Sequence, residues 1–426
     1  MTREFFTTTH NNQLEFLKEG ELYYSKYVEL IKKAHTSIHL QTYIFLFDDF
    51  GTRVASELKK AALRGVKVYL LVDGIGSKDL SVKVEIDLVN SGVYFCRFNS
   101  FKLKWFHKLG RRLHHKVLLI DEQVAIVGGI NVQTEETLPP QLDFAILIEG
   151  PLIVEMANYC KIVFKKAYTE PNLLNFVVSK HTQNFEKNGY KARILVNDWL
   201  LGRSKITQQY AQRTTTAKDQ ITIINPYFFP RRKFMRQLSA AALRGVRVRL
   251  ILPKHSDWPT YILASEHLYN YFLKANVEIY QWTTSKLHGK LATVDNNWTT
   301  IGSFNLNYTS YQQNLEMNID IISSEYTKII NTEIESIIKN GCKKIDQDDF
   351  NGNAPLKIKI KRFFFYLVLS FIASLSIALT YKEGHSKIFN LINVTRFILS
   401  LSILIIIISS LLIFLIYQLY NGFFIF

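Results

Sequence analysis

The chain has 426 residues, room for two ordinary domains, and a formal net charge of +16 that indicates an anionic partner such as nucleic acid, acidic lipid or a phosphorylated metabolite. Its three cysteines, Cys96, Cys160 and Cys342, stand far apart and form no CxxC pair. This pattern argues against a disulfide framework and a zinc ribbon, and it favours a reducing, cytosolic environment.

The first half, residues 1–168, is expected to be an α/β unit. It opens with polar and acidic residues where a secretory signal would need an apolar run of about 7 to 15 residues, so we expect no export signal. β-Branched and aromatic residues predict strands over 37–47 and 93–98. Between them a helical pattern ends at Gly65, and an alternating apolar run over 66–72 predicts another strand.

The second half, residues 191–340, repeats the first. The run AALRGVKV at 61–68 returns as AALRGVRV at 241–248, and matching strands are expected over 220–229 and 277–282. The fold class is therefore α/β, with two pseudo-symmetric lobes that each hold a mixed sheet flanked by helices. The polar stretch 169–190 is expected to connect the lobes.

Each half carries the same polar motif at the same spacing, HxKxxxxD. One copy would be weak evidence, because a His and a Lys two residues apart on a strand are commonly a polar edge, but two copies indicate one shared site. The copies comprise His114, Lys116 and Asp121 in the first half, and His288, Lys290 and Asp295 in the second. Each copy is followed by small and amide residues, namely Gly128, Gly129 and Asn131, and Gly302, Ser303 and Asn305.

Each motif is expected to form a β-hairpin whose return strand brings the glycines and the asparagine back towards the histidine. Two such hairpins, meeting across a pseudo-twofold axis, would surround one phosphate-sized hole with two His, two Lys and two Asn. The glycines would let the substrate approach the backbone, and the Asn amides and the Ser303 hydroxyl would donate to it. The predicted site binds an anion without a metal or a cofactor.

The aspartates of the motifs are too distant to orient the histidines. Seven residues of strand at ~3.3 Å each span about 23 Å, so Asp121 and Asp295 are expected to brace the hairpin turns. Each histidine still needs a carboxylate to fix its tautomer. Asp143, 29 residues after His114, and Glu316, 28 residues after His288, are the expected partners.

The paired histidines indicate attack at phosphorus. A neutral imidazole is a competent nucleophile, and a protonated one can give its proton to the departing alkoxide. The two lysines would offset charge on the non-bridging oxygens. This chemistry predicts a phosphohistidine intermediate that water or an alcohol resolves.

The C-terminal part predicts a membrane anchor. Residues 341–362 are expected to be a basic juxtamembrane linker, and 363–426 a transmembrane hairpin with apolar segments over 363–381 and 397–417. Each segment is about as long as the ~20 residues that cross a bilayer as a helix, although two buried core helices are an alternative. Positive charges before the first segment favour a cytoplasmic catalytic body; they are Lys357, Lys359, Lys361 and Arg362.

From Leu14 to Ile322 the chain resembles the phospholipase D superfamily, and more narrowly bacterial cardiolipin synthases of the shorter type that lack N-terminal membrane spans. Besides the two motifs, the resemblance rests on the segments 43–45, 48–51, 72–74, 128–131, 225–230 and 314–316. The chain departs from many relatives in two ways, since Thr309-Ser310 stands where they have Arg-Ser and its apolar segments lie at the C-terminal end.

The resemblance implies that one histidine is the nucleophile and the other the general acid and base, with His114 and His288 expected in these roles. It implies carboxylate partners at the positions of Asp143 and Glu316. It also implies a phosphatidyltransferase that makes cardiolipin from phosphatidylglycerol at the bacterial inner membrane, facing the cytoplasm and needing no nucleic acid. A phospholipase that uses water, a nuclease of the superfamily and a non-catalytic membrane scaffold are the alternatives.

Overall fold

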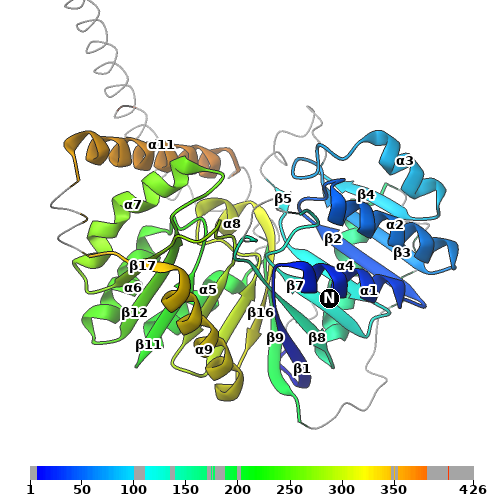
Figure 1. Ribbon diagram of the computed structural model, residues 1–426, viewed down its shortest axis with the longest axis horizontal. Helices are drawn as coiled ribbons and strands as arrows, with labels where there is room; N and C mark the ends of the chain where they lie inside the picture. The colour runs from blue at the N-terminus through cyan, green and yellow to red at the C-terminus, as the bar shows by residue number, and fades with distance from the viewer. Residues whose placement is uncertain are drawn as a thin grey trace, which may run out of the picture.

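The computed structural model describes residues 7–99, 111–134, 140–169, 174, 176–177, 188–198, 203–346, 350, 354–380 and 402. Figure 1 shows two lobes side by side, each with a sheet and its helices. The predicted connection over 169–190 falls mostly outside the described residues, and the mixed α/β architecture of both halves is confirmed.

The first lobe holds a seven-stranded mixed sheet. Strands β2, β3 and β4 are parallel, and the others pair antiparallel. In order across the sheet the strands are β4 (Tyr94–Phe98), β3 (Lys67–Asp73), β2 (Ser37–Thr42), β6 (Lys116–Ile120), β7 (Val124–Gly128), β8 (Phe144–Glu149) and β1 (Thr9–Lys18). Its helices are α1 (Glu21–Lys32), α2 (Asp49–Leu63), α3 (Val82–Asn90) and α4 (Leu152–Ala167).

The second lobe repeats this order and extends it at both edges. Strands β11, β12 and β13 are parallel, as their counterparts are, and β11 pairs antiparallel with β14. The strands run β17 (Cys342–Lys344), β13 (Glu278–Trp282), β12 (Arg247–Pro253), β11 (Gln220–Ile224), β14 (Leu291–Val294), β15 (Trp298–Gly302), β16 (Asn314–Ile321), β9 (Tyr190–Asp198) and β10 (Arg203–Ser204). Its helices are α5 (Lys205–Thr216), α6 (Arg232–Leu243), α7 (Pro259–Leu273), α8 (Tyr308–Gln312) and α9 (Ser324–Gly341).

The sequence repeat is a structural repeat. Helices α2 and α6 end at Leu63 and Leu243, and the glycine two residues later has a φ of +91° in one copy and +95° in the other. A residue with a Cβ rarely adopts that conformation, so glycine ends the helix and turns the chain into the next strand. The two repeated runs therefore build the same helix-to-strand corner.

The lobes share a hydrophobic core as well as their own outer ones. Helices α4 and α9 both contribute to the shared cluster, which includes Leu113 of the first half and Leu315 of the second. Strand β1 pairs with β9, and the short strand β5 (Arg112–Leu113) pairs in parallel with β16 of the other lobe. The halves are thus joined by backbone hydrogen bonds next to the first motif.

The chain after residue 340 differs from the predicted linker and anchor. Strand β17 adds to the sheet edge at β13, and helix α11 (Leu356–Thr380) begins within the predicted linker. The side chain of Arg362 donates to Glu266 of α7 at 2.8 Å, and the Tyr366 ring lies 4.6 Å from that of His267. The first part of the predicted span at 363–381 therefore packs on the enzyme body, because its aromatic residues complement those of α7.

In the described part of the chain, no helix is both long and apolar enough to cross a membrane. The second predicted span, at 397–417, lies outside the described residues except for Ser402.

Candidate active site

The first motif is fixed to a strand of the other lobe. The backbone N–H groups of His114 and His115 both donate to the Leu315 carbonyl of β16, at 2.9 and 3.0 Å. The buried Asp73 at the end of β3 accepts from the Leu113 N–H at 2.8 Å and so holds the segment from its own lobe. His114 therefore stands where the two sheets meet.

The second motif is attached in the equivalent way. The N–H groups of His288 and Gly289 donate to the Leu142 carbonyl at 3.0 and 2.8 Å, and the Leu142 N–H donates back to Lys286 at 2.8 Å. Leu142 precedes Asp143 just as Leu315 precedes Glu316. Each histidine segment is thus bonded to the residue before the carboxylate of the opposite half.

This exchange sets the histidine–carboxylate pairs. The Nδ1 atom of His114 lies 2.8 Å from Oε2 of Glu316, and Nδ1 of His288 lies 2.5 Å from Oδ2 of Asp143. Asp143 and Glu316 are indeed the partners of the histidines, but the pairing suggested by spacing along the chain is wrong. Spacing cannot show that each motif crosses to the other lobe, because that depends on tertiary pairing between β5 and β16.

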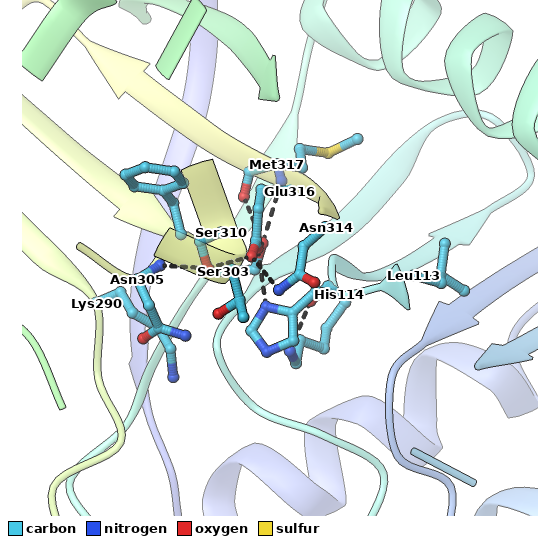
Figure 2. A network of polar contacts seen from close by, with 12 residues as sticks. Leu113, His114, Lys290, Ser303, Asn305, Ser310, Asn314, Glu316 and Met317 are labelled. Atoms are coloured by element: carbon cyan, nitrogen blue, oxygen red, sulfur yellow. Dashed lines mark hydrogen bonds and ion pairs between the residues drawn. The ribbon is translucent and has the colours of Figure 1, made fainter. Parts of the chain in front are cut away.

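Glu316 is held by a ring of neutral donors (Figure 2). Ser303 donates to the oxygen that also meets His114, at 2.5 Å, while Ser310 and Asn314 donate to the other oxygen at 2.6 and 3.0 Å. Burial raises the pKa of Glu316, but the nearby His114, Lys116 and Ser303 lower it by more, so the pKa lies below its usual range. The carboxylate therefore stays ionised and fixed in position.

Asp143 has fewer donors. Its Oδ1 accepts from the Phe144 N–H at 2.7 Å, and Gly129 stands where the second half has Ser303. A Cβ at Gly129 would lie 2.3 Å from Asp143 Oδ1, so only glycine leaves room for this carboxylate. Burial raises the pKa of Asp143, yet Lys290 and His288 lower it to below its ordinary value.

The imidazole of His114 is buried and that of His288 is half-buried, and both are neutral in the free enzyme at neutral pH. Burial lowers the pKa of His114, and burial together with the Lys290 charge lowers that of His288 to about 4. With Nδ1 of each ring directed at a carboxylate, the Nδ1 atom carries the proton and Nε2 is left for chemistry. This is the protonation state that a nitrogen nucleophile needs.

The two lysines are buried cations. Lys116 donates to the His114 carbonyl at 2.6 Å, and Lys290 donates to the His288 carbonyl in the same way. Burial and the neighbouring Lys290 lower the pKa of Lys116 to about 7, and burial lowers that of Lys290 to about 8. An anion entering the site would meet poorly solvated positive charge, which is a strong electrostatic attraction.

The motif aspartates lie at the hairpin turns, as the distance estimate predicted. Asp121 accepts from the backbone N–H groups of His35, Thr36 and Ser37, and Asp295 accepts from those of Lys218, Asp219 and Gln220. Both have positive φ values, which suit a tight two-residue turn. Both aspartates therefore tie each hairpin to its neighbouring strand and lie apart from the histidines.

The structure gives the candidate substrate-binding residues different surroundings. Asn131 accepts from the Ile44 N–H at 3.2 Å, whereas the side-chain oxygen of the buried Asn305 has no hydrogen-bond partner among the described residues. Figure 2 shows Asn305 beside Lys290 and Ser303. Ser303 gives its hydroxyl to Glu316, so the expectation that it donates to substrate is corrected.

The small residues make room for neighbouring strands. Gly128 pairs with Lys116, and a Cβ there would lie 2.4 Å from the Phe144 carbonyl oxygen of β8. A Cβ at Gly302 would lie 2.3 Å from the Met317 carbonyl oxygen of β16. The predicted role of these glycines, backbone approach by substrate, is thus replaced by close packing that brings the carboxylates to the histidines.

Sequence reasoning missed two tyrosines beside the histidines. The ring of Tyr43 lies 5.0 Å from that of His114 and 5.5 Å from the Lys116 ammonium, and the ring of Tyr227 lies 6.3 Å from that of His288. The signal was present, because Tyr43 directly follows β2 and Tyr227 follows its counterpart β11 by three residues. Ser310 was also missed, although it belongs to the Thr309-Ser310 pair that marks the departure from relatives.

In the described part of the chain, no three His, Cys, Asp or Glu side chains come together as metal ligands. The groups that converge are two imidazoles, two ammonium groups and two carboxylates, a set that suits a phosphate ester.

The family comparisons agree with this geometry. The family model described as cardiolipin synthase, PLD-like domain, matches residues 27–167 and 210–338. Cardiolipin synthase B of Salmonella typhi is 33% identical over 344 residues, which cover 79% of this chain and 83% of that protein. Cardiolipin synthase B of Escherichia coli strain K12 is 31% identical over 345 residues with the same coverage.

The chain belongs to the phospholipase D-like cardiolipin synthase family. It is a phosphatidyltransferase of the phospholipase D superfamily. Among solved structures, phosphatidylserine synthase of Haemophilus influenzae superposes with a TM-score of 0.67 at 15% identity, covering 85% of this chain and 94% of its own. That similarity shows that the two proteins share a fold although they have little sequence in common.

Proposed function

We propose that this family member makes cardiolipin from two molecules of phosphatidylglycerol through a covalent intermediate on His114. The observation that carries the proposal is the crossed pair of imidazoles, each with Nδ1 held by a carboxylate and each beside a buried lysine. Such a pair provides one nucleophile and one proton carrier on either side of a single phosphorus atom.

In the first step, Nε2 of His114 attacks the phosphorus of the donor lipid. The bond from phosphorus to the glycerol oxygen breaks, and the glycerol leaves with a proton from Nε2 of His288. In the empty site the pKa of His288 is about 4, so His288 takes up this proton from solvent as the substrate binds. The negative phosphodiester supplies the charge that stabilises the imidazolium, together with Asp143.

In the second step, the acceptor hydroxyl belongs to a second phosphatidylglycerol. His288, now neutral, takes the proton of that hydroxyl while its oxygen attacks phosphorus, and the bond between phosphorus and His114 breaks. Cardiolipin leaves, and the proton is back on His288. The two lysines stabilise the non-bridging oxygens in both steps. The side-chain oxygen of Asn305, which has no partner among the described residues, can accept a hydrogen bond from a lipid hydroxyl.

A membrane location fits these substrates. We propose that the apolar C-terminal segments hold the enzyme at the bacterial inner membrane with the catalytic body in the cytoplasm, as the lysines before residue 363 suggest. Confinement of the enzyme to the membrane raises the effective concentration of both lipids at the site.

The test is product analysis with purified full-length protein and phosphatidylglycerol in mixed micelles. Cardiolipin and glycerol are expected in equal amounts, with none from the His114→Asn variant. Phosphatidic acid as the sole phospholipid product would replace the proposal with a hydrolase. Cleavage of single-stranded DNA without any lipid product would replace it with a nuclease.

A further inference from the structure

Helix α11 carries exposed apolar side chains and exposed lysines together. Leu356 is 72% exposed, Ile360 is 59% exposed, and Ile358, Phe363 and Ile372 are exposed as well. Lys357, Lys359 and Lys361 alternate with the first of these residues, and all three are exposed. In the part of the chain that the structure describes, none of these lysines forms an ion pair with a carboxylate.

The opposite side of α11 is firmly packed. Arg362 is paired with Glu266 and stacks 4.0 Å from the Phe350 ring centre, and Phe365, Tyr366 and Leu369 pack on the outer core of the second lobe. The helix is therefore fixed on the enzyme body along α7, and its exposed side has a defined direction.

Helix α11 lies close to the loop beside the catalytic centre. The Tyr366 ring is 5.6 Å from that of Phe229, which shares a loop with Tyr227, the neighbour of His288. Trp258, 62% exposed, stands just before α7, and Tyr261 in the first turn of α7 contacts Tyr227 at 5.4 Å. In Figure 1, α11, α8 and β5 lie along the same upper side of the molecule.

We propose that α11 is an in-plane docking helix for an anionic phospholipid bilayer. The docking face comprises Leu356, Ile360 and Phe363, which lie on one side of the helix, with Lys357, Lys359 and Lys361 around them and Trp258 before α7. Apolar side chains flanked by lysines suit the boundary between acyl chains and anionic headgroups, and tryptophan favours the same depth. Three unpaired positive charges disfavour a second copy of the same face and favour a negative surface.

Docking in this way brings the loop that holds Tyr227, the neighbour of His288, close to the bilayer that supplies the lipids. The inference rests on the proposed function, because it assumes that the substrate lies in that bilayer. It adds that the body of the second lobe, and not only an apolar segment further along the chain, contacts lipid.

The test uses full-length protein with a single NBD fluorophore at Ile360→Cys, and wild-type protein treated identically to report any reaction of the native cysteines. The matched control is Leu243→Cys, which is 69% exposed in the same lobe. Leu243 ends α6 just before β12 begins, at the end of the parallel strands opposite to the site. Vesicles of phosphatidylglycerol and phosphatidylcholine, with a nitroxide on some acyl chains, serve as the probe.

The label at residue 360 is expected to shift to shorter emission wavelengths and to be quenched by the nitroxide lipid, whereas the label at 243 stays aqueous. The apparent affinity for vesicles, read from this shift, should fall about tenfold or more when the vesicles are pure phosphatidylcholine. It should fall similarly for the triple variant K357Q/K359Q/K361Q. The proposal is overturned if the residue 360 label stays as accessible to aqueous iodide as the residue 243 label. It is also overturned if the shift appears without lipid and grows with protein concentration, which would indicate a second copy.

Turnover of dispersed short-chain phosphatidylglycerol separates this proposal from the enzymatic one. The triple lysine variant should keep that turnover unchanged while losing turnover of vesicle lipid. If no short-chain product forms in the wild type, the proposed function fails, whatever the fluorophore reports.

Discussion

The two halves of the site share a backbone and differ in how they hold their carboxylates. In both, a histidine segment donates to the carbonyl that precedes the carboxylate of the other half. Among the described residues, Glu316 then receives three side-chain donors besides His114, whereas Asp143 receives one backbone donor besides His288. The duplicated halves thus share one backbone arrangement, while different residues surround the carboxylates that hold the two histidines.

This difference agrees with separate roles for the histidines. Because Ser303, Ser310 and Asn314 fix Glu316 as an acceptor, the His114 ring is held in one orientation with Nε2 free for attack. Asp143 accepts fewer hydrogen bonds among the described residues, and the Lys290 charge lies near it. The charge state of His288 is therefore more responsive to an incoming phosphate. We therefore infer that the more rigid half holds the nucleophile and the other half moves protons.

The largest expected effect comes from removing either imidazole. His114→Asn and His288→Asn should each lower kcat by about 10⁴-fold or more, because loss of a nucleophile or its proton carrier disables the whole unit. The variants should differ in one respect, since only His114→Asn abolishes the release of glycerol in a single turnover. Equal residual glycerol release from both would contradict the division of roles.

The crossed pairing is tested by double variants. Glu316→Gln should cost about 10²- to 10⁴-fold in kcat/KM, and adding it to His114→Asn should cost nothing more. Adding Glu316→Gln to His288→Asn should lower activity further. The reverse pattern, with Glu316 coupled to His288, would mean that each carboxylate serves the histidine of its own half.

Exchanging the small residues next to the carboxylates should affect the halves unequally. Gly129→Ala places a Cβ 2.3 Å from Asp143 Oδ1 and should lower kcat by about 10²-fold by displacing that carboxylate. Ser303→Gly removes one donor from Glu316 and should cost only about tenfold. Since that donor lowers the pKa of Glu316, its loss should also move the acidic limb of the pH–rate profile to higher pH. Similar losses and unchanged profiles for both variants would contradict the comparison.

The smallest effect concerns stability. The pKa of Lys116 is about 7 in the folded protein against 10.5 normally, so between these values the unfolded chain binds more protons and stability rises with pH. Lys116→Met should abolish turnover, yet raise the melting temperature near neutral pH. The expected rise is ~2–4 °C for each kcal/mol added to the free energy of unfolding. It should also flatten the pH dependence of the melting temperature between about pH 7 and pH 10. A lower melting temperature in this variant would show that the buried ammonium stabilises the fold.

Sequence reasoning predicted the two repeated lobes because local residue patterns determine their helices and strands. The glycines at 65 and 245 end helices in both copies, and the alternating apolar runs after them form β3 and β12 as expected. The two predicted motif hairpins form as β6–β7 and β14–β15. The position of Asp121 and Asp295 at the turns also followed from strand length alone.

The remaining features depend on contacts between distant segments. The exchange of Asp143 and Glu316 follows from hydrogen bonds between Leu315 and the first motif and between Leu142 and the second, which no spacing reports. The packing of α11 on α7 was likewise hidden, because the apolarity of residues 363–380 reads as a membrane segment whichever surface the helix contacts. Ser303 was assigned to the substrate for a similar reason, since its hydroxyl could serve either partner.

The most direct measurement is to trap the intermediate with short-chain phosphatidylglycerol by rapid denaturation at neutral pH and short times, because the P–N bond hydrolyses in acid. The phosphatidyl group is then mapped by peptide mass spectrometry under conditions that preserve phosphohistidine. The account predicts one adduct, on His114, which persists in Asp143→Asn and is absent in Glu316→Gln at the same time point. An adduct on His288, or cardiolipin formation with no adduct at any time, would contradict it.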